Sequence, residues 1–415
     1  MTAGTLGAQL RDMTPAILHG ESRGWSYFDG PSGTQMIAPA IDAAAEFSRT
    51  GLANRGNPSP AGEETENVVA TARAELRAMF RADAYDVVFG QNMTSLAFAL
   101  GHAFARRWAR GAGTLVVTML EHAGNVESWA QPFAERGVRT ATIDVDDRTL
   151  ALEPGGFDRV DAHGGVALVA ITGAANSVGV KPDLAQAHDF ARAHDALFVV
   201  DGVHATPHGP LDLADVDPDV FLCSAYKFYG PHLGIALIKS DLLDELRTFK
   251  VAPAPDSGPE KLETGTQNHE AIAGLAAAVC GVGRLVGRPS GDGARAALHA
   301  LGAADEAVAS RLAGDLRSLP GVRVFGHQGD ETAHAPTIAF TVDGIPPEEV
   351  GRALRQRGVF VTTGDFYATR LARRLGVDAW GGWVRVGLSG YTNSEDVGRL
   401  LESLSRIVGN RATRA

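Results

Sequence analysis

The 415-residue chain has few cysteines, no excess of basic residues and no long apolar run, and each shortage excludes a class of protein. Its two cysteines, Cys223 and Cys280, are too few for a disulfide framework and indicate a reducing compartment. A formal net charge of -11 argues against binding to nucleic acid or to an anionic membrane surface, because both attract basic proteins. No stretch approaches the roughly 18 apolar residues that a membrane helix requires. The N-terminal residues lack the basic start and apolar core of a secretion signal, so we expect a cytoplasmic protein.

What is present is the composition of an ordinary globular protein, with 45% hydrophobic and 21% charged residues. Between about residues 65 and 240, short apolar runs alternate with helix-like stretches. The runs lie at 87–89, 114–120, 166–172, 196–201, 220–225 and 234–240. Apolar strands separated by helices predict an α/β domain with a mostly parallel sheet and helices on both faces.

The rest of the chain predicts a second, smaller domain. Residues 251–265 are rich in proline, glycine and charge, as in a connector. We therefore expect a large domain over 31–265, a connecting helix within 266–295, and a small α+β C-terminal domain over 296–415. That domain should include strands at 337–342 and 383–389, and the segment 1–30 should pack against it.

Polar side chains follow several of the predicted strands, at the edge where ligands gather in open α/β sheets. Asp201 ends one strand, Thr94 follows another and precedes a helix, and Ser224 and Lys227 close a third. We expect these side chains, which are distant along the chain, to line one crevice.

Lys227 stands out because it lies between aromatic residues, after an apolar strand and before a Gly-Pro turn. Taken alone, it could be a lysine whose stem is buried and whose amine reaches solvent. Desolvation lowers the pKa of a lysine, however, and makes it a nucleophile that forms Schiff bases. Asp201, at the end of an apolar strand, needs a partner, and a protonated ring nitrogen would supply one.

Motifs over nearly the whole chain resemble those of a known family. Asp-Gly-x-His at 201–204, Ser-x-x-Lys at 224–227 and Gly-Pro-x-x-Gly at 230–234 resemble the core of the class V aminotransferase group. The chain more closely resembles the cysteine desulfurase-like proteins of that group. Further matching motifs are FDGPSG, NRGNPSP, FGQNMTSLAF, LEHAGNVESW, AANSVG, ETGTQN and RVGLSGYTNSEDV. The resemblance implies a fold type I enzyme that uses pyridoxal 5′-phosphate (PLP) and acts on an amino acid as a homodimer.

The resemblance also implies a role for particular residues in catalysis and cofactor binding. Lys227 would hold PLP as a Schiff base, and Asp201 would keep the pyridine nitrogen protonated. His122 would stack on the ring. His204 would form a hydrogen bond near the phenolic oxygen, where relatives often have glutamine. Asn176 would contact the cofactor or the substrate carboxylate.

The remaining implied contacts involve the phosphate and the substrate. The backbone at Met93 and the side chain of Thr94 would bind the phosphate at a helix N-terminus, with hydroxyl groups from Ser224 and Tyr226. Many relatives have histidine where this chain has Tyr226. Thr266 would reach the phosphate of a neighbouring subunit, and Arg385 would bind the α-carboxylate of the substrate in a bidentate manner.

The chain departs from the family at one point. Persulfide-forming cysteine desulfurases have a nucleophilic cysteine on a mobile loop, but the corresponding segment 359–371 contains none and carries Asp365 and Tyr367 instead. Cys223 and Cys280 lie in apolar stretches typical of inert core thiols. We therefore do not expect sulfur to be carried on a thiol of this enzyme.

Several activities stay open, because the same residues serve all of them. The leading expectation is a C–S or C–Se lyase, and the alternatives are an aminotransferase or epimerase of a specialised-metabolite amino acid. A non-catalytic PLP-binding partner protein is a further alternative. We expect no metal site, because Pro207 interrupts any helix between His204 and His208 and no further ligands are apparent.

Overall fold

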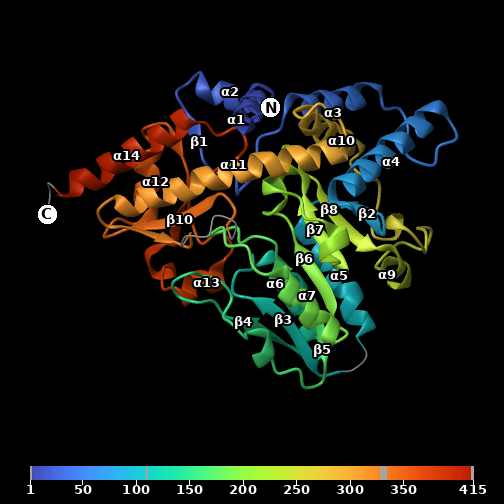
Figure 1. Cartoon of the computed structure of the whole chain (residues 1–415). Helices are drawn as coiled ribbons and strands as arrows, with labels where there is room; N and C mark the ends of the chain where they lie inside the picture. Colours follow the sequence, from blue (N-terminus) through green and yellow to red (C-terminus); the bar gives the residue numbers. More distant parts are fainter. Residues whose placement is uncertain (1, 109–110, 328–333, 413–415) are drawn as a thin grey trace.

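The main sheet has seven strands, and the computed structural model describes residues 2–108, 111–327 and 334–412 (Figure 1). In spatial order the strands are β2 (Tyr85–Gly90), β8 (Gly234–Lys239), β7 (Val220–Ser224), β6 (Leu197–Asp201), β5 (Val166–Thr172), β3 (Gly113–Thr118) and β4 (Val138–Ile143). β8 runs antiparallel to both of its neighbours, β2 and β7, and the other neighbouring strands pair in parallel. The prediction of a mostly parallel α/β sheet is therefore confirmed.

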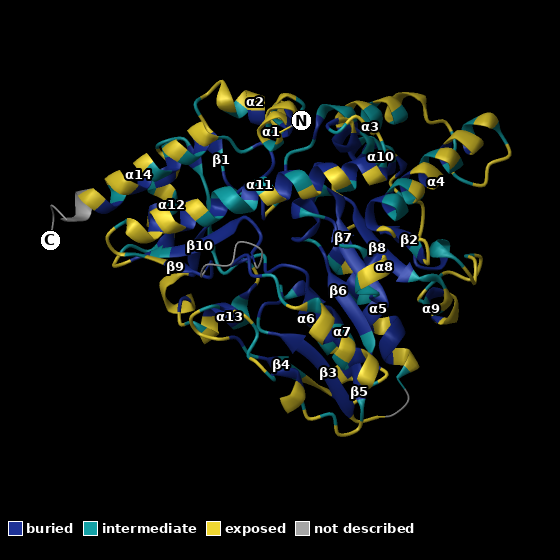
Figure 2. Ribbon diagram, viewed as in Figure 1, coloured by how far each residue is buried: buried dark blue, intermediate teal, exposed yellow. Residues whose placement is uncertain are grey.

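Helices cover both faces of this sheet. As a result, β3, β5 and β7 are buried along their whole length (Figure 2). One face packs against α5 (Met93–Arg107), α6 (Gly124–Ala134) and α9 (Ser240–Glu245). The apolar core on the other face includes residues of α3 (Ala38–Thr50), α4 (Pro60–Phe80), α7 (Leu184–Ala193), α8 (Leu213–Val216), α10 (His269–Arg284) and α11 (Gly291–Ser318). No described helix is both long and apolar enough to cross a membrane.

A second, antiparallel sheet follows in the chain, with the order β12 (Thr362–Gly364), β13 (Trp383–Gly387), β10 (Thr337–Val342) and β9 (Val322–Phe325). The helices α12 (Pro347–Arg355) and α14 (Ser394–Ala412) share its apolar core. A short helix, α13 (Thr369–Arg374), follows β12. The strand β1 (Ser26–Tyr27) pairs in parallel with β11 (Val359–Phe360), which brings the N-terminal segment to this part of the molecule.

The connection between the two sheets is made by α11, which runs from the large sheet to the small one (Figure 1). The helix predicted within 266–295 is mainly α10, and α10 packs on α3 and α4 beside the large sheet. The N-terminal helices α1 (Ala3–Asp12) and α2 (Pro15–Glu21) precede β1. The division into a large domain over 31–265 and a small domain over 296–415, with the segment 1–30 packed on the latter, stays a proposal. In this division, α11 connects the two domains.

Candidate active site

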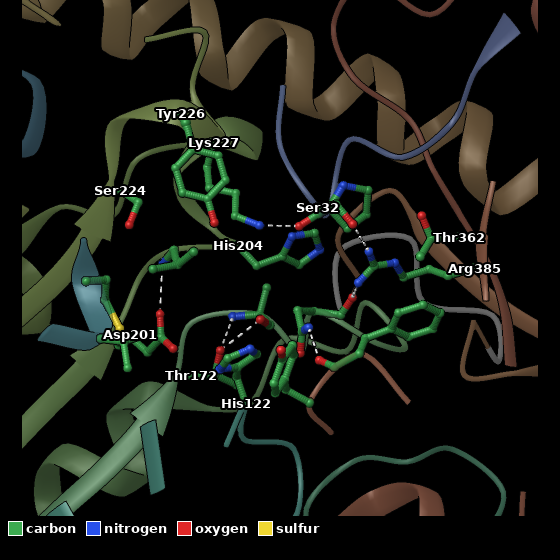
Figure 3. A pocket seen from close by; sticks show the side chains of 18 of the residues that line it. Ser32, His122, Thr172, Asp201, His204, Ser224, Tyr226, Lys227, Thr362 and Arg385 are labelled. Atoms are coloured by element: carbon green, nitrogen blue, oxygen red, sulfur yellow. Dashed lines mark hydrogen bonds between the residues drawn. The ribbon is translucent and has the colours of Figure 1, made fainter. Parts of the chain in front are cut away.

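A cavity of about 450 Å³ lies at the carboxyl ends of β5, β6 and β7, where the small sheet faces the large one (Figure 3). It is lined by ten of the predicted site residues: Met93, Thr94, His122, Asn176, Asp201, His204, Ser224, Tyr226, Lys227 and Arg385. The expected convergence of chain-distant residues is therefore present in the structure. Their individual roles stay predictions.

Lys227 ends a short 3-10 turn that follows β7, and its amine points into the cavity (Figure 3). The side chain is buried, and Nζ donates a hydrogen bond to the carbonyl oxygen of Pro31. Burial, with a smaller contribution from the charge of Arg385, lowers the pKa of Lys227 to about 7. A large fraction of Lys227 amines is therefore neutral and nucleophilic near neutral pH.

The other lysines of the chain have partners elsewhere. Lys181 pairs with Glu306, Lys239 with Asp217, and Lys250 with Asp256. The fourth, Lys261, donates to the carbonyl oxygens of residues 243 and 244. Lys227 is thus the lysine that the fold presents to the cavity.

Asp201 closes β6 and is buried, with the backbone N–H of Val203 donating to its Oδ1 at 2.9 Å. Burial raises the pKa of Asp201 to about 6, against the opposing effect of that hydrogen bond and of Lys227. The carboxyl group is still mostly ionised at neutral pH. It is an acceptor that suits a cationic N–H group placed in the cavity.

His122 follows β3 and is held as a neutral imidazole. The backbone N–H of Gly124 donates to Nδ1 at 2.9 Å, so the ring hydrogen is on Nε2. Burial and the charges of Lys227 and Arg385 lower the pKa of His122 to about 4. A neutral ring of this kind can cover a flat ligand without adding charge.

Glu121 was missed in the sequence, although it precedes His122 in one of the quoted motifs. Its buried carboxyl group receives hydrogen bonds from Thr118 Oγ1 (2.7 Å), Asn125 Nδ2 (2.6 Å) and the backbone N–H of Thr172 (3.1 Å). Trp129 Nε1 donates to Asn125 Oδ1, which fixes the orientation of that amide. Burial raises the pKa of Glu121 to about 8. This network ties the segment that carries His122 to the end of β5.

The N-terminus of α5 opens into the cavity. Asn92 is its N-cap: Ser95 N–H donates to Asn92 Oδ1 at 2.8 Å, and the Ser95 side chain accepts from Asn92 N–H. A Cβ atom at Gly234 would lie 2.3 Å from the backbone of Asn92, so glycine is required at the start of β8. Met93 and Thr94, in the first turn, therefore meet the cavity at a helix N-terminus, which favours an anion such as phosphate.

Arg385 lies on β13 and is buried against segments that the sequence did not connect to it. Its Nη2 donates to Asp29 Oδ1 at 3.1 Å and to Ser32 Oγ at 2.7 Å, and its Nη1 donates to the carbonyl oxygen of Asn176 at 3.0 Å. The ring of Phe366 covers the guanidinium at 4.0 Å. Both hydrogens of Nη2 are engaged in these hydrogen bonds. Bidentate binding of a substrate carboxylate therefore requires the bond to Asp29 or the bond to Ser32 to break.

The segment between β12 and α13 forms one wall of the cavity. Phe366 and Tyr367 both have a positive φ, 55° and 59°, which is uncommon for residues other than glycine. The Asn176 side chain donates to the carbonyl oxygen of Phe366 at 2.9 Å, and the Ala123 N–H donates to that of Tyr367 at 2.8 Å. The fold therefore holds this segment against Asn176 and Ala123, with the exposed Tyr367 ring 5.2 Å from the ring of His122.

Thr266 is the one predicted site residue that lies outside the cavity. It is exposed, in a separate depression beside Ser95 and Gln267. The segment is anchored by Glu263, whose buried carboxylate receives two hydrogen bonds of 2.9 Å from Arg73 and one from the Phe89 N–H. Contact with a phosphate in a neighbouring subunit stays a prediction.

Glu263→Ala is expected to lower the free energy of unfolding by about 3 kcal/mol, because it leaves the largely buried guanidinium of Arg73 without its main partner. Glu402→Ala removes a solvent-exposed pair with Arg406 and should change the free energy by less than about 0.5 kcal/mol. Urea unfolding of both variants measures the difference. Equal effects would show that the Glu263–Arg73 pair does not stabilise the fold.

The cavity fits PLP on the evidence of its own polar groups. A buried, easily deprotonated amine is available for the aldehyde, a helix N-terminus for the phosphate and a buried carboxylate for the ring nitrogen. Asn176 Oδ1, His204 Nδ1 and Arg385 Nε are buried and have no hydrogen-bond partner in the part of the chain that the structure describes. Such atoms need a ligand or water to bond with. His204 and His208 lie with ring centroids 5.3 Å apart, and the described residues contain no group of three or more potential metal ligands.

This fold and this cavity define a PLP-dependent enzyme of fold type I. Residues 26–400 match the family model described as aminotransferase class-V, and the chain belongs to that family. A cysteine desulfurase from Escherichia coli (strain K12 / DH10B) is 28% identical over 400 residues, which cover 92% of this chain and 93% of that protein. A cysteine desulfurase from Shigella flexneri matches equally well, with 28% identity over the same shares of the two chains.

Solved structures agree on the fold. The apo structure of cysteine desulfurase from Thermococcus onnurineus NA1 has a TM-score of 0.86 at 21% identity, covering 97% of this chain and 98% of that chain. The S-sulfonic acid form of the cysteine desulfurase CsdA from Escherichia coli has a TM-score of 0.84, also at 21% identity and with the same coverage. The predicted class, fold type and cofactor are therefore confirmed.

Proposed function

We propose that the protein is a C–S or C–Se lyase that acts on an amino acid with PLP held on Lys227, and that it carries no sulfur on a thiol of its own. The observation that supports this proposal most is the composition of the cavity. Lys227, Asp201 and Arg385 line it together, whereas neither cysteine of the chain does.

The two thiols are poorly placed for sulfur transfer. Cys223 is fully buried in β7 on the side of the core, and burial raises the pKa of its thiol far above the usual value. Cys280 is half-buried on α10, and burial raises its pKa as well. Since the thiolate is the nucleophile, both thiols should be unreactive. The segment where cysteine desulfurases are expected to carry a cysteine presents Tyr367 at the cavity instead.

The chain's own residues account for binding and proton transfer. When bound, PLP supplies an electron sink that stabilises negative charge at the substrate Cα. Asp201 would accept a hydrogen bond from the ring nitrogen and so hold a proton there. Lys227, once its amine is free, would take the Cα proton at Nζ, for which a pKa near 7 is suited. Arg385 would orient the substrate carboxylate, and the neutral His122 ring would cover the cofactor face and exclude water.

The rate at which the apoenzyme captures PLP should rise with pH up to about pH 7 and then level off. The lowered pKa of about 7 means that Lys227 is protonated and unreactive below this pH and a neutral amine above it. Stopped-flow absorbance between pH 5.5 and about 9 measures the rate. As a control, the rate at which Nα-acetyl-lysine reacts with PLP should keep rising towards pH ~10, because its ε-amine has an ordinary pKa. A similar slope for the enzyme would show that Lys227 is not desolvated.

We also propose a cytoplasmic homodimer. The exposed apolar side chains of Leu52, Phe249 and Val251 support an interface with a second copy, as does the exposed Thr266 outside the cavity of its own chain. Light scattering would measure the mass of the assembly. A monomer with full PLP occupancy would remove the role proposed for Thr266.

Product analysis tests the proposed reaction. PLP-loaded enzyme is incubated with cysteine, selenocysteine or S-substituted cysteines, with an added thiol as sulfur acceptor and Lys227→Ala as the control. Pyruvate with ammonia, or alanine with released sulfur or selenium, would establish cleavage at the β-position. If no Lys227-dependent product forms, the lyase proposal fails, and amino-group transfer or epimerisation becomes the reaction to test.

A further inference from the structure

His204 reaches the cavity from the large domain but is held by the small one. It lies in the turn after β6 and is buried, and its Nε2 is 3.0 Å from Oγ1 of Thr337, the first residue of β10. Its other ring nitrogen, Nδ1, is buried and has no hydrogen-bond partner among the described residues. The ring lies near the amine of Lys227 in the cavity (Figure 3).

The hydroxyl group of Thr337 has a single acceptor for its hydrogen. Thr337 is fully buried, and His204 Nε2 is the only hydrogen-bond partner of its Oγ1 among the described residues. A buried hydroxyl hydrogen without an acceptor is costly, so the hydrogen should point to Nε2. His204 is neutral, because burial, followed by the neighbouring His208, Lys227, Arg385 and Lys181, keeps its pKa well below the usual value. A neutral ring whose Nε2 accepts must carry its hydrogen on Nδ1.

The backbone of Thr337 is held by further hydrogen bonds, which fix the position of its Cβ atom beside His204. Its N–H donates to the carbonyl oxygen of Ala335 at 2.6 Å. Its own carbonyl oxygen accepts from His327 Nε2 at 2.7 Å, and the residue pairs with Gly387 in the small sheet. The side-chain rotamer seen in the structure then brings the hydroxyl group within hydrogen-bond distance of His204 Nε2.

We propose that Thr337 is a positioning residue that sets the tautomer of His204, so that Nδ1–H is available as a hydrogen-bond donor in the cavity. The inference rests on the proposed binding of PLP at Lys227, whose phenolic oxygen is the acceptor that this donor would meet. A donor at that oxygen favours its ionised form and orients the ring. Because the Thr337–His204 bond joins the two domains, the small domain takes part in tuning the cofactor site.

Histidine-selective 15N NMR of the apoenzyme tests this tautomer without any PLP or substrate. The His204 signal is identified by its loss in His204→Gln. The expected result is a hydrogen on Nδ1 in the wild type and in Thr337→Ser, which keeps the hydroxyl donor. Thr337→Val should give a mixture of the two tautomers. Thr341→Val, the same substitution elsewhere on β10, should leave the signal unchanged.

Absorbance of the PLP-loaded variants supplies a second readout. Thr337→Val should weaken PLP retention by about fivefold, the value of one ordinary hydrogen bond, and Thr337→Ser should restore it. A wild-type His204 with its hydrogen on Nε2, or a Thr337→Val spectrum identical to the wild type, overturns the inference. If Thr337→Val does not fold, the 15N NMR spectrum of the wild type alone tests the tautomer of His204. Failure of the lyase proposal would appear in the product analysis and not in this spectrum.

Discussion

Replacing Lys227 with alanine is expected to abolish the covalent PLP adduct and to lower turnover by about 10⁴-fold. The reason is that no other lysine can take over. Lys227 alone among the lysines lines the cavity, and the others are engaged with carboxylates or with backbone carbonyl oxygens. Lys227→Arg should behave in the same way, because a guanidinium group stays charged and cannot form a Schiff base.

Borohydride reduction followed by peptide mass spectrometry measures the adduct directly, and visible absorbance reports the loss of the bound chromophore. Lys181→Ala is the matched control, because Lys181 is also partly buried but pairs with Glu306 outside the cavity. The control variant should keep both the adduct and the turnover. An adduct on a different lysine in Lys227→Ala, with activity retained, would refute the assignment.

Asp201→Asn is expected to lower turnover by about 10²–10³-fold, which corresponds to the roughly 3–4 kcal/mol typical of removing one charge from a buried pair. Asparagine keeps the shape of the side chain and can still accept the hydrogen bond from Val203 N–H. It cannot compensate the positive charge of a protonated ring nitrogen, so the ring becomes a poorer electron sink. Steady-state kinetics with the substrate found by product analysis measures the effect.

Asp183→Asn is a suitable control for this variant. Asp183 caps α7 by accepting hydrogen bonds from Ala185 N–H and Gln186 N–H, and asparagine is an equally good cap. Turnover should stay within about twofold of the wild type in this variant. If Asp201→Asn also stays within that range, Asp201 does not hold the ring proton.

The strands of the large sheet were largely predictable, because a strand buried on both faces has a continuous apolar run. The run at 166–172 coincides with β5 of the large sheet, and the run at 337–342 coincides with β10 of the small sheet. The edge strand β4 was not predicted, because its exposed positions, including Arg139 and Thr140, interrupt the apolar pattern. The antiparallel direction of β8 was not predictable either, since an apolar run does not encode its direction in a sheet.

The convergence of the site could be predicted where residues end parallel strands, as Asp201 and Ser224 do. Residues that act through contacts between distant segments were missed. Asp29 pairs with Arg385 across 356 positions of the chain, and Thr337 meets His204 across 133. Glu121 lay within a recognised motif, but only its contact with the backbone of Thr172 shows what it supports. Such tertiary contacts leave no periodic signal in the sequence.

The central claim, a lyase that depends on Lys227 and on no thiol of its own, is tested most directly by product formation in a chain without cysteines. The variant combines Cys223→Ala with Cys280→Ala and is given the sulfur or selenium substrate, with release of sulfide or selenide as the readout. We predict Lys227-dependent turnover within about twofold of the wild type, because neither thiol reaches the cavity. Loss of turnover in a folded variant that still binds PLP would contradict the account and assign the sulfur chemistry to one of these cysteines.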